Sequence, residues 1–525
     1  MPDWARKSSL YLLLAALLLA VLWKGAYFPG EKWVFAWLLI AAGALELGLG
    51  AYERRVQLPR APAFWLLTVF TVFGAASLFW SVSPVDTERE SVFMLGLLAA
   101  FFVAQSHLRR EGPPALVSIS IWLAYAAGFT SALGVISFIT RTPAYTELLD
   151  GIYRASSTFE YSNALSCFGL MALPVTAALF HQSARQNRPL IAVAMSLQSA
   201  AVLLTYARFG LVALVILSIY LLAEGWRRGT ALSVALALAG GVVAALAATL
   251  MADAGQGAGG IRGSALLIAG ILVEVLMMAG VWLLVKLVEP VGKESGCDRT
   301  LPVAKLAAGA AGAAVLAAAL LAGASARFRV IIATRFEDGF TLSRLLPARL
   351  DTYQGAIDAF RVRPLAGSGL GSFPRVYQQY AIAVYTKYAH NLVLETAVDT
   401  GLAGAALLAA FLAYAVALSL WRLFIRASPL GRAFAITTLV FAAYNMFDWE
   451  WYIPALTAWF VVGLACLESG AAPPAGDAAG GSAGAGTPPA ATNPGTPPLC
   501  GTNPVCHNLA SRCYLASRSA VTNAM

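Results

Sequence analysis

The chain has 525 residues, of which 59% are hydrophobic and only 12% are charged, and its mean hydropathy is +0.71. Soluble domains carry about 25% charged residues, so this composition excludes a water-soluble enzyme, a disulfide scaffold and a nucleic-acid-binding protein. The apolar residues fall in long charge-free runs, which predicts an all-α, polytopic transmembrane helix bundle. In a membrane protein, the formal net charge of +9 bears on the orientation of the loops and on the binding of anionic, lipid-like ligands.

About 12–14 membrane spans are expected, because a bilayer core of ~30 Å needs ~20 apolar residues per helix. The first part of the bundle, residues 1–326, holds about eleven runs: Ser9–Tyr27, Trp33–Ala51, Ala63–Trp80, Ser91–His107, Ala115–Ile139, Ser162–His181, Pro189–Tyr206, Phe209–Glu224, Thr230–Met251, Ser264–Val288 and Val303–Ala326. Residues 402–468 hold the last three: Leu402–Phe424, Gly431–Phe447 and Tyr452–Leu467. The two runs that flank Arg208 are short, so one of them could be re-entrant.

Lysines and arginines are distributed unevenly between alternate connections of these spans. With a cytoplasmic N-terminus, the inward segments hold eighteen of them and the short outward segments hold seven. Because cytoplasmic loops carry the excess of Lys and Arg, this bias predicts that the N-terminus lies inside the cell. The same alternation places the long connection 327–401 outside.

The connection 327–401 is too long to be an idle link within a compact bundle. Leu350, Tyr353, Ile357 and Phe360 recur at intervals of three and four, and Phe373–Val384 repeats that apolar pattern. Two amphipathic helices are therefore predicted in this extracytoplasmic loop. Residues 469–525 change to a composition rich in Ala, Gly, Pro, Thr and Ser, which predicts a disordered cytoplasmic tail.

Only one of the four histidines, His390, lies on the outer side of the membrane by this topology. An imidazole can exchange a proton near neutral pH, so His390 is the leading candidate for acid–base chemistry, although its position alone favours a loop histidine that caps or hydrogen-bonds the next helix. The same loop is rich in arginine, which suits bidentate binding of phosphate or pyrophosphate: Arg327, Arg329, Arg335, Arg344, Arg349, Arg361, Arg363 and Arg375 occur beside a single Lys387.

Three further features carry possible chemistry. Arg208 lies in a two-residue turn between apolar runs and needs an anionic partner, unless it reaches the lipid headgroups. Gly367, Gly369 and Gly371 form a cluster whose N–H groups could bind an anion or simply allow a tight turn. Glu274 lies near the middle of a span, where a carboxyl group is either structural or part of a proton-coupled transporter.

Several segments together resemble the O-antigen ligase and polymerase superfamily of bacterial integral-membrane glycosyltransferases. They are Arg349-Leu-Asp-Thr-Tyr-Gln, Arg363-Pro-Leu-Ala-Gly-Ser-Gly-Leu-Gly-Ser-Phe373, Tyr388-Ala-His-Asn-Leu-Val-Leu-Glu395 and Thr400-Gly-Leu-Ala-Gly404. Upstream, Arg154-Ala-Ser-Ser-Thr-Phe-Glu-Tyr-Ser-Asn163 and Thr205-Tyr-Ala-Arg208 are similar to two more segments of that family.

The resemblance implies a GT-C-like membrane glycosyltransferase in the bacterial inner membrane, in lipopolysaccharide or other envelope polysaccharide biosynthesis. Its donor would be a glycan on polyprenyl (undecaprenyl) pyrophosphate, and its acceptor a lipid-borne (lipid A-core) or surface sugar. His390 would be the general base, and Arg349 and Arg208 would stabilise the pyrophosphate. Arg154, Asn163, Asn391, Glu395 and the three glycines would bind substrate. Because the outer segments lack a D-x-D-like motif, we expect neither a metal ion nor another cofactor.

Two sets of alternatives stay open from the sequence alone. Within the superfamily, a ligase is preferred over an O-antigen or exopolysaccharide polymerase, and a protein O-oligosaccharyltransferase comes third. A lipid-linked glycan flippase or proton-coupled transporter would belong to another class and would rely on Glu274 and the many spans. A transporter predicts inverted internal repeats, and the sequence shows no convincing one.

Overall fold

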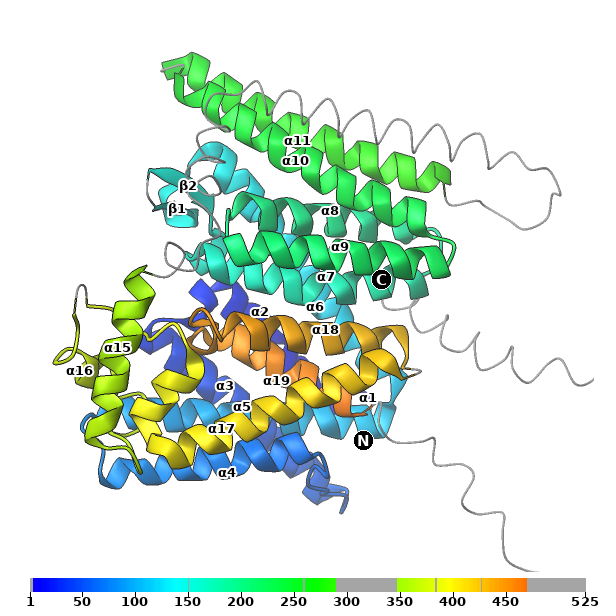
Figure 1. The fold of residues 1–525 in the computed structure, drawn as a ribbon. Coiled ribbons are helices and arrows are strands. Elements are labelled where there is room, and N and C mark those ends of the chain that lie inside the picture. Colours follow the sequence, from blue (N-terminus) through cyan, green and yellow to red (C-terminus); the bar gives the residue numbers. More distant parts are fainter. Residues whose placement is uncertain are drawn as a thin grey trace, which may run out of the picture.

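The protein is a bundle of long helices in the computed structural model, which describes residues 3–149, 151–257, 260–288, 347–382, 385–425 and 427–469 (Figure 1). The predicted span Val303–Ala326, the loop arginines from Arg327 to Arg344 and the tail after 469 lie outside the described residues. The all-α membrane class is confirmed, since nine of the described helices are long and apolar enough to cross a membrane and four shorter ones are also apolar.

The helices of the bundle follow the predicted spans closely. They are α1 (Asp3–Arg6), α2 (Ser8–Leu22), α3 (Pro29–Tyr52), α4 (Pro62–Ala76), α5 (Pro84–Glu111), α6 (Pro113–Thr140), α7 (Ser162–Gln182), α8 (Arg188–Leu204), α9 (Arg208–Arg227), α10 (Ala231–Gly257), α11 (Gly260–Val288), α17 (Leu392–Phe424), α18 (Pro429–Tyr444) and α19 (Pro454–Ser469). Several begin at proline, whose fixed φ suits the first turn and whose missing N–H is not needed there.

Two helices lie between α11 and α17: α15 (Pro347–Val362) and α16 (Phe373–Tyr377). The first amphipathic helix is therefore confirmed, because α15 carries all four of its predicted apolar positions. The second is much shorter than predicted, since α16 has only five residues. Proline at its second position starts it, and tight turns replace the rest of the expected helix.

A short antiparallel hairpin, β1 (Thr146–Leu149) and β2 (Ile152–Ala155), was not predicted from the sequence. In it Thr146 faces Ala155 and Glu147 faces Arg154. Gly151, with φ of +73°, lies at the turn between the two strands. The hairpin positions Arg154, one of the predicted site residues.

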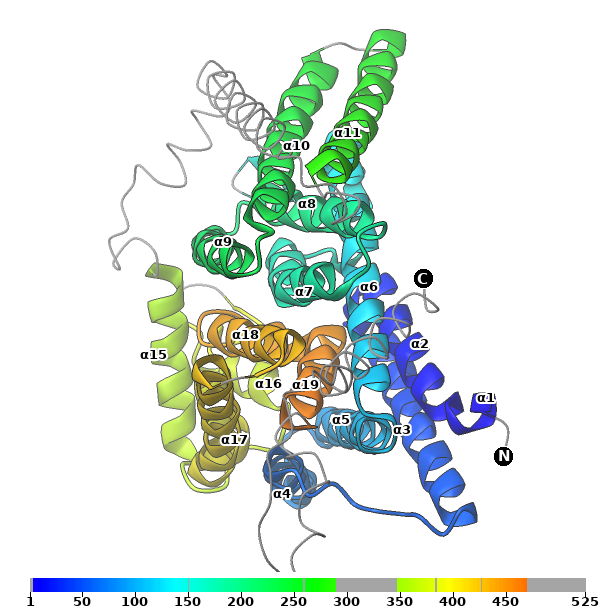
Figure 2. The same ribbon diagram turned by 90° about the vertical axis from the view of Figure 1, so that its right-hand side faces the viewer.

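Helix α7 is the centre of the bundle. Nearly all of its residues are buried, and it contacts α6, α8, α9 and α18. Helices α10 and α11 form an outlying pair that packs against α8 (Figures 1 and 2). Helices α3, α9 and α11 expose many apolar side chains, as expected for helices that face lipid.

From α2 to α11 and again from α17 to α19, successive helices of the bundle run in opposite directions, so the described parts of the predicted outward connections lie at one end of the bundle. We call this end, which carries α15, α16 and the hairpin (left in Figure 1), the site end. The first residue of α19 and the last residues of α2, α8 and α18 belong to it. The other end, which we call the opposite end, carries the connections that were predicted to be cytoplasmic.

Helix α17 differs from its prediction at its start. It begins at Leu392, ten residues before the predicted span, and non-helical backbone at Gly401 kinks it. The predicted start at Leu402 therefore coincides with the kink. The first part, before Gly401, carries polar residues of the site end and packs against α15.

Candidate functional site

The site end has a polar centre at the Asp448 carboxylate, which lies in the short connection between α18 and α19. His390 Nδ1 is 2.8 Å from Asp448 Oδ1. The Asp448 side chain is 6% exposed and the His390 side chain is 24% exposed, so the pair is anchored inside the protein while the imidazole reaches solvent. An ionised carboxylate only accepts hydrogen bonds. Nδ1 is therefore the donor, and Nε2 is left as the basic nitrogen.

The backbone around His390 is held from several directions. His390 has a left-handed backbone conformation, with φ of +54°, and its carbonyl accepts a hydrogen bond of 3.2 Å from Tyr353 Oη on α15. Asn391 caps α17 by accepting from the Leu394 N–H at 3.0 Å, and its amide donates to the Met446 carbonyl. These contacts fix the ring's position relative to Asp448.

Glu395 lies one turn into α17 and is only 2% exposed. Its Oε2 accepts a hydrogen bond of 2.7 Å from the Ala389 N–H. Glu395 thus holds the residue before His390 instead of presenting its carboxylate to solvent.

Arg349 approaches the same carboxylate from α15. Its Nη2 lies 3.9 Å from Asp448 Oδ2, and its side chain is 29% exposed. Within the described residues, most of its five N–H donors have no acceptor. Burial by itself would raise the pKa of Asp448, but the hydrogen bond and charge of His390, with Arg349 and Asn163, hold it below its usual range. The carboxylate is ionised at neutral pH.

Two residues at the start of α7 complete the polar centre. Tyr161 Oη donates to both Asp448 oxygens, at 3.0 and 2.9 Å. The Asn163 amide donates to Tyr161 Oη at 2.9 Å and also to Asp448 Oδ2. Burial and the nearby negative charge of Asp448 raise the pKa of Tyr161 well above its usual value, so its phenol keeps the proton that it donates.

Arg154 on β2 is buried, at 4% exposure. Its Nε donates to the Thr205 carbonyl at 2.6 Å and its Nη2 donates to Asn163 Oδ1 at 2.8 Å. Its Nη1 is 3.6 Å from Glu147 on β1. Arg154 therefore connects the hairpin, the end of α8 and Asn163.

Arg208 is the first residue of α9, and its Nε is buried without a hydrogen bond to any described residue. The next residue, Phe209, packs edge-on against Tyr444, with 4.7 Å between ring centroids, and lies 5.9 Å from the Phe447 ring. Tyr444 and Phe447 come just before Asp448 in the chain. Arg208 therefore lies beside the segment that carries Asp448, although within the described residues the structure shows no ion pair between the two.

The glycine cluster faces the first part of α17. Gly367, Gly369 and Gly371 all have positive φ, as a tight turn requires. The Gly371 N–H donates to Asp399 Oδ2 at 2.8 Å and the Phe373 N–H donates to Asp399 Oδ1 at 2.6 Å. The Gly369 N–H donates to the Asp399 carbonyl at 2.7 Å. The group that this turn holds is thus the protein's own Asp399 carboxyl group.

Sequence reasoning missed Asp448 and Tyr161. Tyr161 stands inside the segment that resembles the family, but no role was attached to it. Asp448 and Glu450 are two acids in a short connection between apolar spans, and this pattern was a usable signal. Glu450 is fully buried, and both burial and the charge of Asp448 raise its pKa well above the usual range. Burial thus favours the protonated form of Glu450, whereas the partners of Asp448 favour its charged form.

The fold and site together define a polytopic all-α membrane protein with a His–Asp–Arg centre at one end of its helices. Residues 258–409 match the family model described as O-antigen ligase. This segment contains Arg349, the glycine turn and His390, and over this part of the chain the match supports the resemblance to the O-antigen ligase and polymerase superfamily, whose members are glycan-transfer enzymes. A search of curated proteins gives no match.

Proposed function

We propose that the protein transfers a preassembled glycan from polyprenyl (undecaprenyl) pyrophosphate to a lipid- or surface-borne sugar. The reaction takes place on the outer face of the bacterial inner membrane. The observation that carries the proposal is the contact of His390 Nδ1 with the buried, ionised Asp448, within reach of Arg349. A general base, its orienting carboxylate and a cation for the leaving group then share one centre.

In the proposed reaction, an acceptor hydroxyl oxygen attacks the anomeric carbon of the donor sugar. The bond from that carbon to the pyrophosphate oxygen breaks, and the polyprenyl pyrophosphate leaves with the electron pair. His390 Nε2 takes the hydroxyl proton. Asp448 favours the tautomer with the proton on Nδ1 and stabilises the imidazolium that forms, as the carboxylate of a catalytic triad does.

The leaving pyrophosphate gains negative charge as this bond breaks. Fixed arginines in a partly dry site stabilise such charge, often as the largest catalytic contribution. Arg349 and Arg208 are proposed for this role, since Arg349 keeps free donors and Arg208 has an Nε that is buried without a partner among the described residues. The contacts of Arg154, Asn163, Asn391, Glu395 and the glycines at 367, 369 and 371 support a role in holding the substrate site in shape.

The test is glycan transfer by the purified protein in detergent, with polyprenyl-pyrophosphate glycan as donor and with candidate acceptors. We expect His390→Ala to lose about 10²–10⁴-fold in turnover, the range for a general base. Arg349→Ala should also lose transfer, whereas Arg361→Ala should not. Arg361 lies on the same helix, with its side chain 68% exposed and paired only with Asp358 among the described residues. Full turnover by His390→Ala would refute the proposed base.

The same assay separates the alternatives. A ligase adds the glycan to a lipid A-core or other envelope acceptor, a polymerase lengthens the lipid-linked glycan, and a protein oligosaccharyltransferase modifies a polypeptide. The reaction is proposed to need no metal ion, so a chelator should leave turnover unchanged.

One observation favours a transporter as the second candidate. Glu274 on α11 is 5% exposed, and neither of its carboxyl oxygens has a hydrogen-bond partner within the described part of the chain. A buried carboxyl group of this kind is a common feature of proton pathways. Turnover of donor in detergent would contradict this candidate, because transport needs a sealed membrane.

A further inference from the structure

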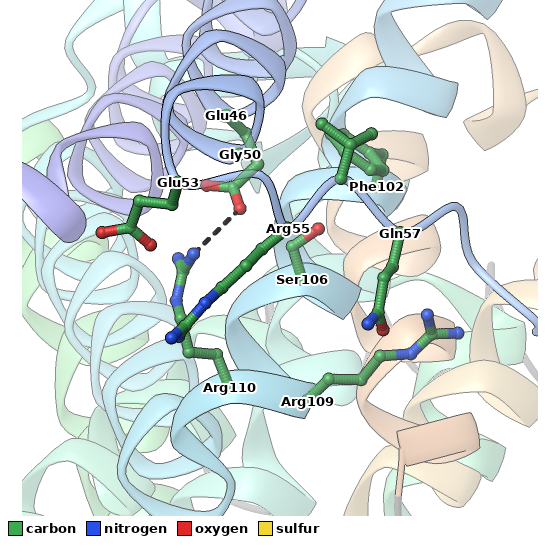
Figure 3. A pocket seen from close by; sticks show the side chains of 10 residues that line it. Glu46, Gly50, Glu53, Arg55, Gln57, Phe102, Ser106, Arg109 and Arg110 are labelled. Carbon is green, nitrogen blue, oxygen red and sulfur yellow. Dashed lines mark hydrogen bonds and ion pairs between the residues drawn. The ribbon is translucent and has the colours of Figure 1, made fainter.

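A polar hollow lies at the opposite end of the bundle, away from His390. It has a volume of about 200 Å³, whereas one water molecule needs only ~10–15 Å³. The end of α3, the segment that follows it and the last turns of α5 form its walls (Figure 3). Its polar lining consists of Glu46, Glu53, Arg55, Gln57, Ser106, Arg109 and Arg110.

Both carboxylates of this hollow already have cationic or hydrogen-bonding partners. Glu46 is 3.2 Å from Arg110 Nη1 and 3.3 Å from His107 Nε2. It also accepts a hydrogen bond of 2.6 Å from Ser9. Glu53 pairs with Arg6 at 3.3 Å. These carboxylates therefore leave the other arginines of the hollow without a negative partner among the described residues.

Arg55 and Arg109 are those remaining cations. The Arg55 side chain makes no hydrogen bond or ion pair with a described residue, and Figure 3 shows it lying across the hollow beside Arg110. Arg109 extends from α5 towards Gln57 (Figure 3) and spends one donor on the Leu58 carbonyl, at 3.0 Å. The charge of Arg60 repels Arg109 and that of Glu468 attracts it, but the Glu468 carboxyl group already accepts hydrogen bonds from the Ala63 N–H and the Tyr414 hydroxyl. The hollow thus has an excess of positive charge and needs an anion.

The surroundings of the hollow indicate where this anion comes from. Tyr52, Val56 and Leu58 are 74%, 48% and 54% exposed, so apolar side chains flank the arginines. The Trp65 indole N–H donates to the Pro59 carbonyl at 3.0 Å, and tryptophan is enriched at the membrane–water boundary. These features are those expected of an anion site at the level of the lipid headgroups, with the exposed apolar side chains next to the acyl chains.

We propose that this hollow binds the phosphate of an anionic phospholipid in the leaflet at the opposite end. The forks of Arg55 and Arg109 suit two phosphate oxygens, and the Ser106 hydroxyl, which has no partner within the described residues, can donate to a third. The lipid would join the segment after α3 to the end of α5. This site is separate from the proposed transfer reaction and does not depend on it.

The test is native mass spectrometry of the delipidated full-length protein in detergent, titrated with phosphatidylglycerol. We expect Arg55→Gln/Arg109→Gln to bind the first lipid about tenfold more weakly than the wild type, which corresponds to about 1.4 kcal/mol. Arg55→Lys should fall in between, because it keeps the charge and loses the fork. Arg227→Gln is the matched control, since Arg227 is exposed at the opposite end and does not line the hollow.

A second titration with inorganic phosphate, followed by thermal stability, identifies the source of the anion. Stabilisation by phosphatidylglycerol, lost in the double variant, together with no effect of millimolar phosphate, supports a lipid. Equal stabilisation by inorganic phosphate would overturn the lipid assignment in favour of a soluble phosphate. Equal lipid binding by the wild type, the double variant and Arg227→Gln would overturn the site itself.

Discussion

Asp448 accepts hydrogen bonds from side chains that arrive from two distant parts of the chain, Tyr161 and Asn163 on one side and His390 on the other. Asp448→Asn keeps the shape but removes the charge that fixes the tautomer and stabilises the imidazolium. We expect turnover to fall by about 10²-fold or more. The transfer assay measures this loss.

Asp358→Asn provides the control for this prediction, since Asp358 is an exposed carboxylate on α15 that contacts Gln354 and Arg361. An Asp448→Asn variant with the turnover of the wild type would show that Asp448 does not act through His390. The lowered pKa of Asp448 also has a consequence for stability. Its contribution is complete above the unfolded-state pKa, near pH ~4, and is lost as the pH falls through the lower folded-state value.

Arg154 illustrates a residue whose contacts differ from the substrate contact that the sequence suggested. All three of its nitrogens face protein acceptors. Arg154→Met leaves these acceptors without donors, so we expect a loss of about 3–5 kcal/mol of stability. Thermal unfolding in detergent measures it, with Arg361→Met as the exposed control. A variant of normal thermal stability with a raised KM for the donor would instead indicate direct binding.

At the level of single residues, the sequence predicted His390 because it is the one histidine on the outer side, and Arg349 because it lies in an arginine-rich segment that resembles the family. Asp448 was not predicted, because its role comes from three-dimensional proximity. It lies 58 positions from His390 and 285 from Asn163, and no local pattern encodes those distances. Glu395 and the glycines were recognised as a motif, but their partners Ala389 and Asp399 only become visible in the fold.

At the level of elements, the apolar runs located all thirteen of the expected spans that fall within the described residues, and the fourteenth, Val303–Ala326, lies outside them. A run this long and this free of charge matches the thickness of a bilayer core, so composition alone is enough to locate it. The prediction of secondary structure was wrong for short elements, which give only a short sequence pattern. Helix α16 ends after five residues, although the apolar periodicity continues to Val384. The hairpin of β1 and β2 has four-residue strands, which are too short to show an alternating pattern.

The kink of α17 offers a test at this scale. Gly401 has φ of +67° and ψ of −170°, a region that essentially only glycine adopts, and a Cβ there would collide with the Leu365 carbonyl. Gly401→Ala should therefore cost more than about 2 kcal/mol of stability and displace the glycine turn. Thermal unfolding and transfer activity check both effects.

Gly48→Ala is the matched control for the kink, because a Cβ at Gly48 meets nothing within 4 Å and alanine favours helix. We expect it to leave stability unchanged or slightly raised. If Gly401→Ala were as stable and active as Gly48→Ala, the kink would have no role in holding the turn against α17.

At the level of the whole molecule, the alternation of Lys and Arg along the sequence and the three-dimensional arrangement agree. Segments counted as outward gather at the site end, and those counted as inward gather at the opposite end. The two ends differ in chemistry as well: one has the His–Asp–Arg centre and the other has the arginine-lined hollow. A membrane between them would separate glycan transfer from the proposed lipid site.

The orientation of the molecule is the last prediction, and single cysteines in a background without the native ones can test it. Arg361→Cys lies at the site end and Arg227→Cys at the opposite end, and both positions are exposed. Because eighteen of the counted cations belong to the inward connections, the positive-inside bias predicts that a membrane-impermeant maleimide labels Arg361→Cys in intact cells. Arg227→Cys should be labelled only after the membrane is permeabilised. The reverse pattern would place His390 on the cytoplasmic side, where the proposed outer-leaflet donor could not reach it.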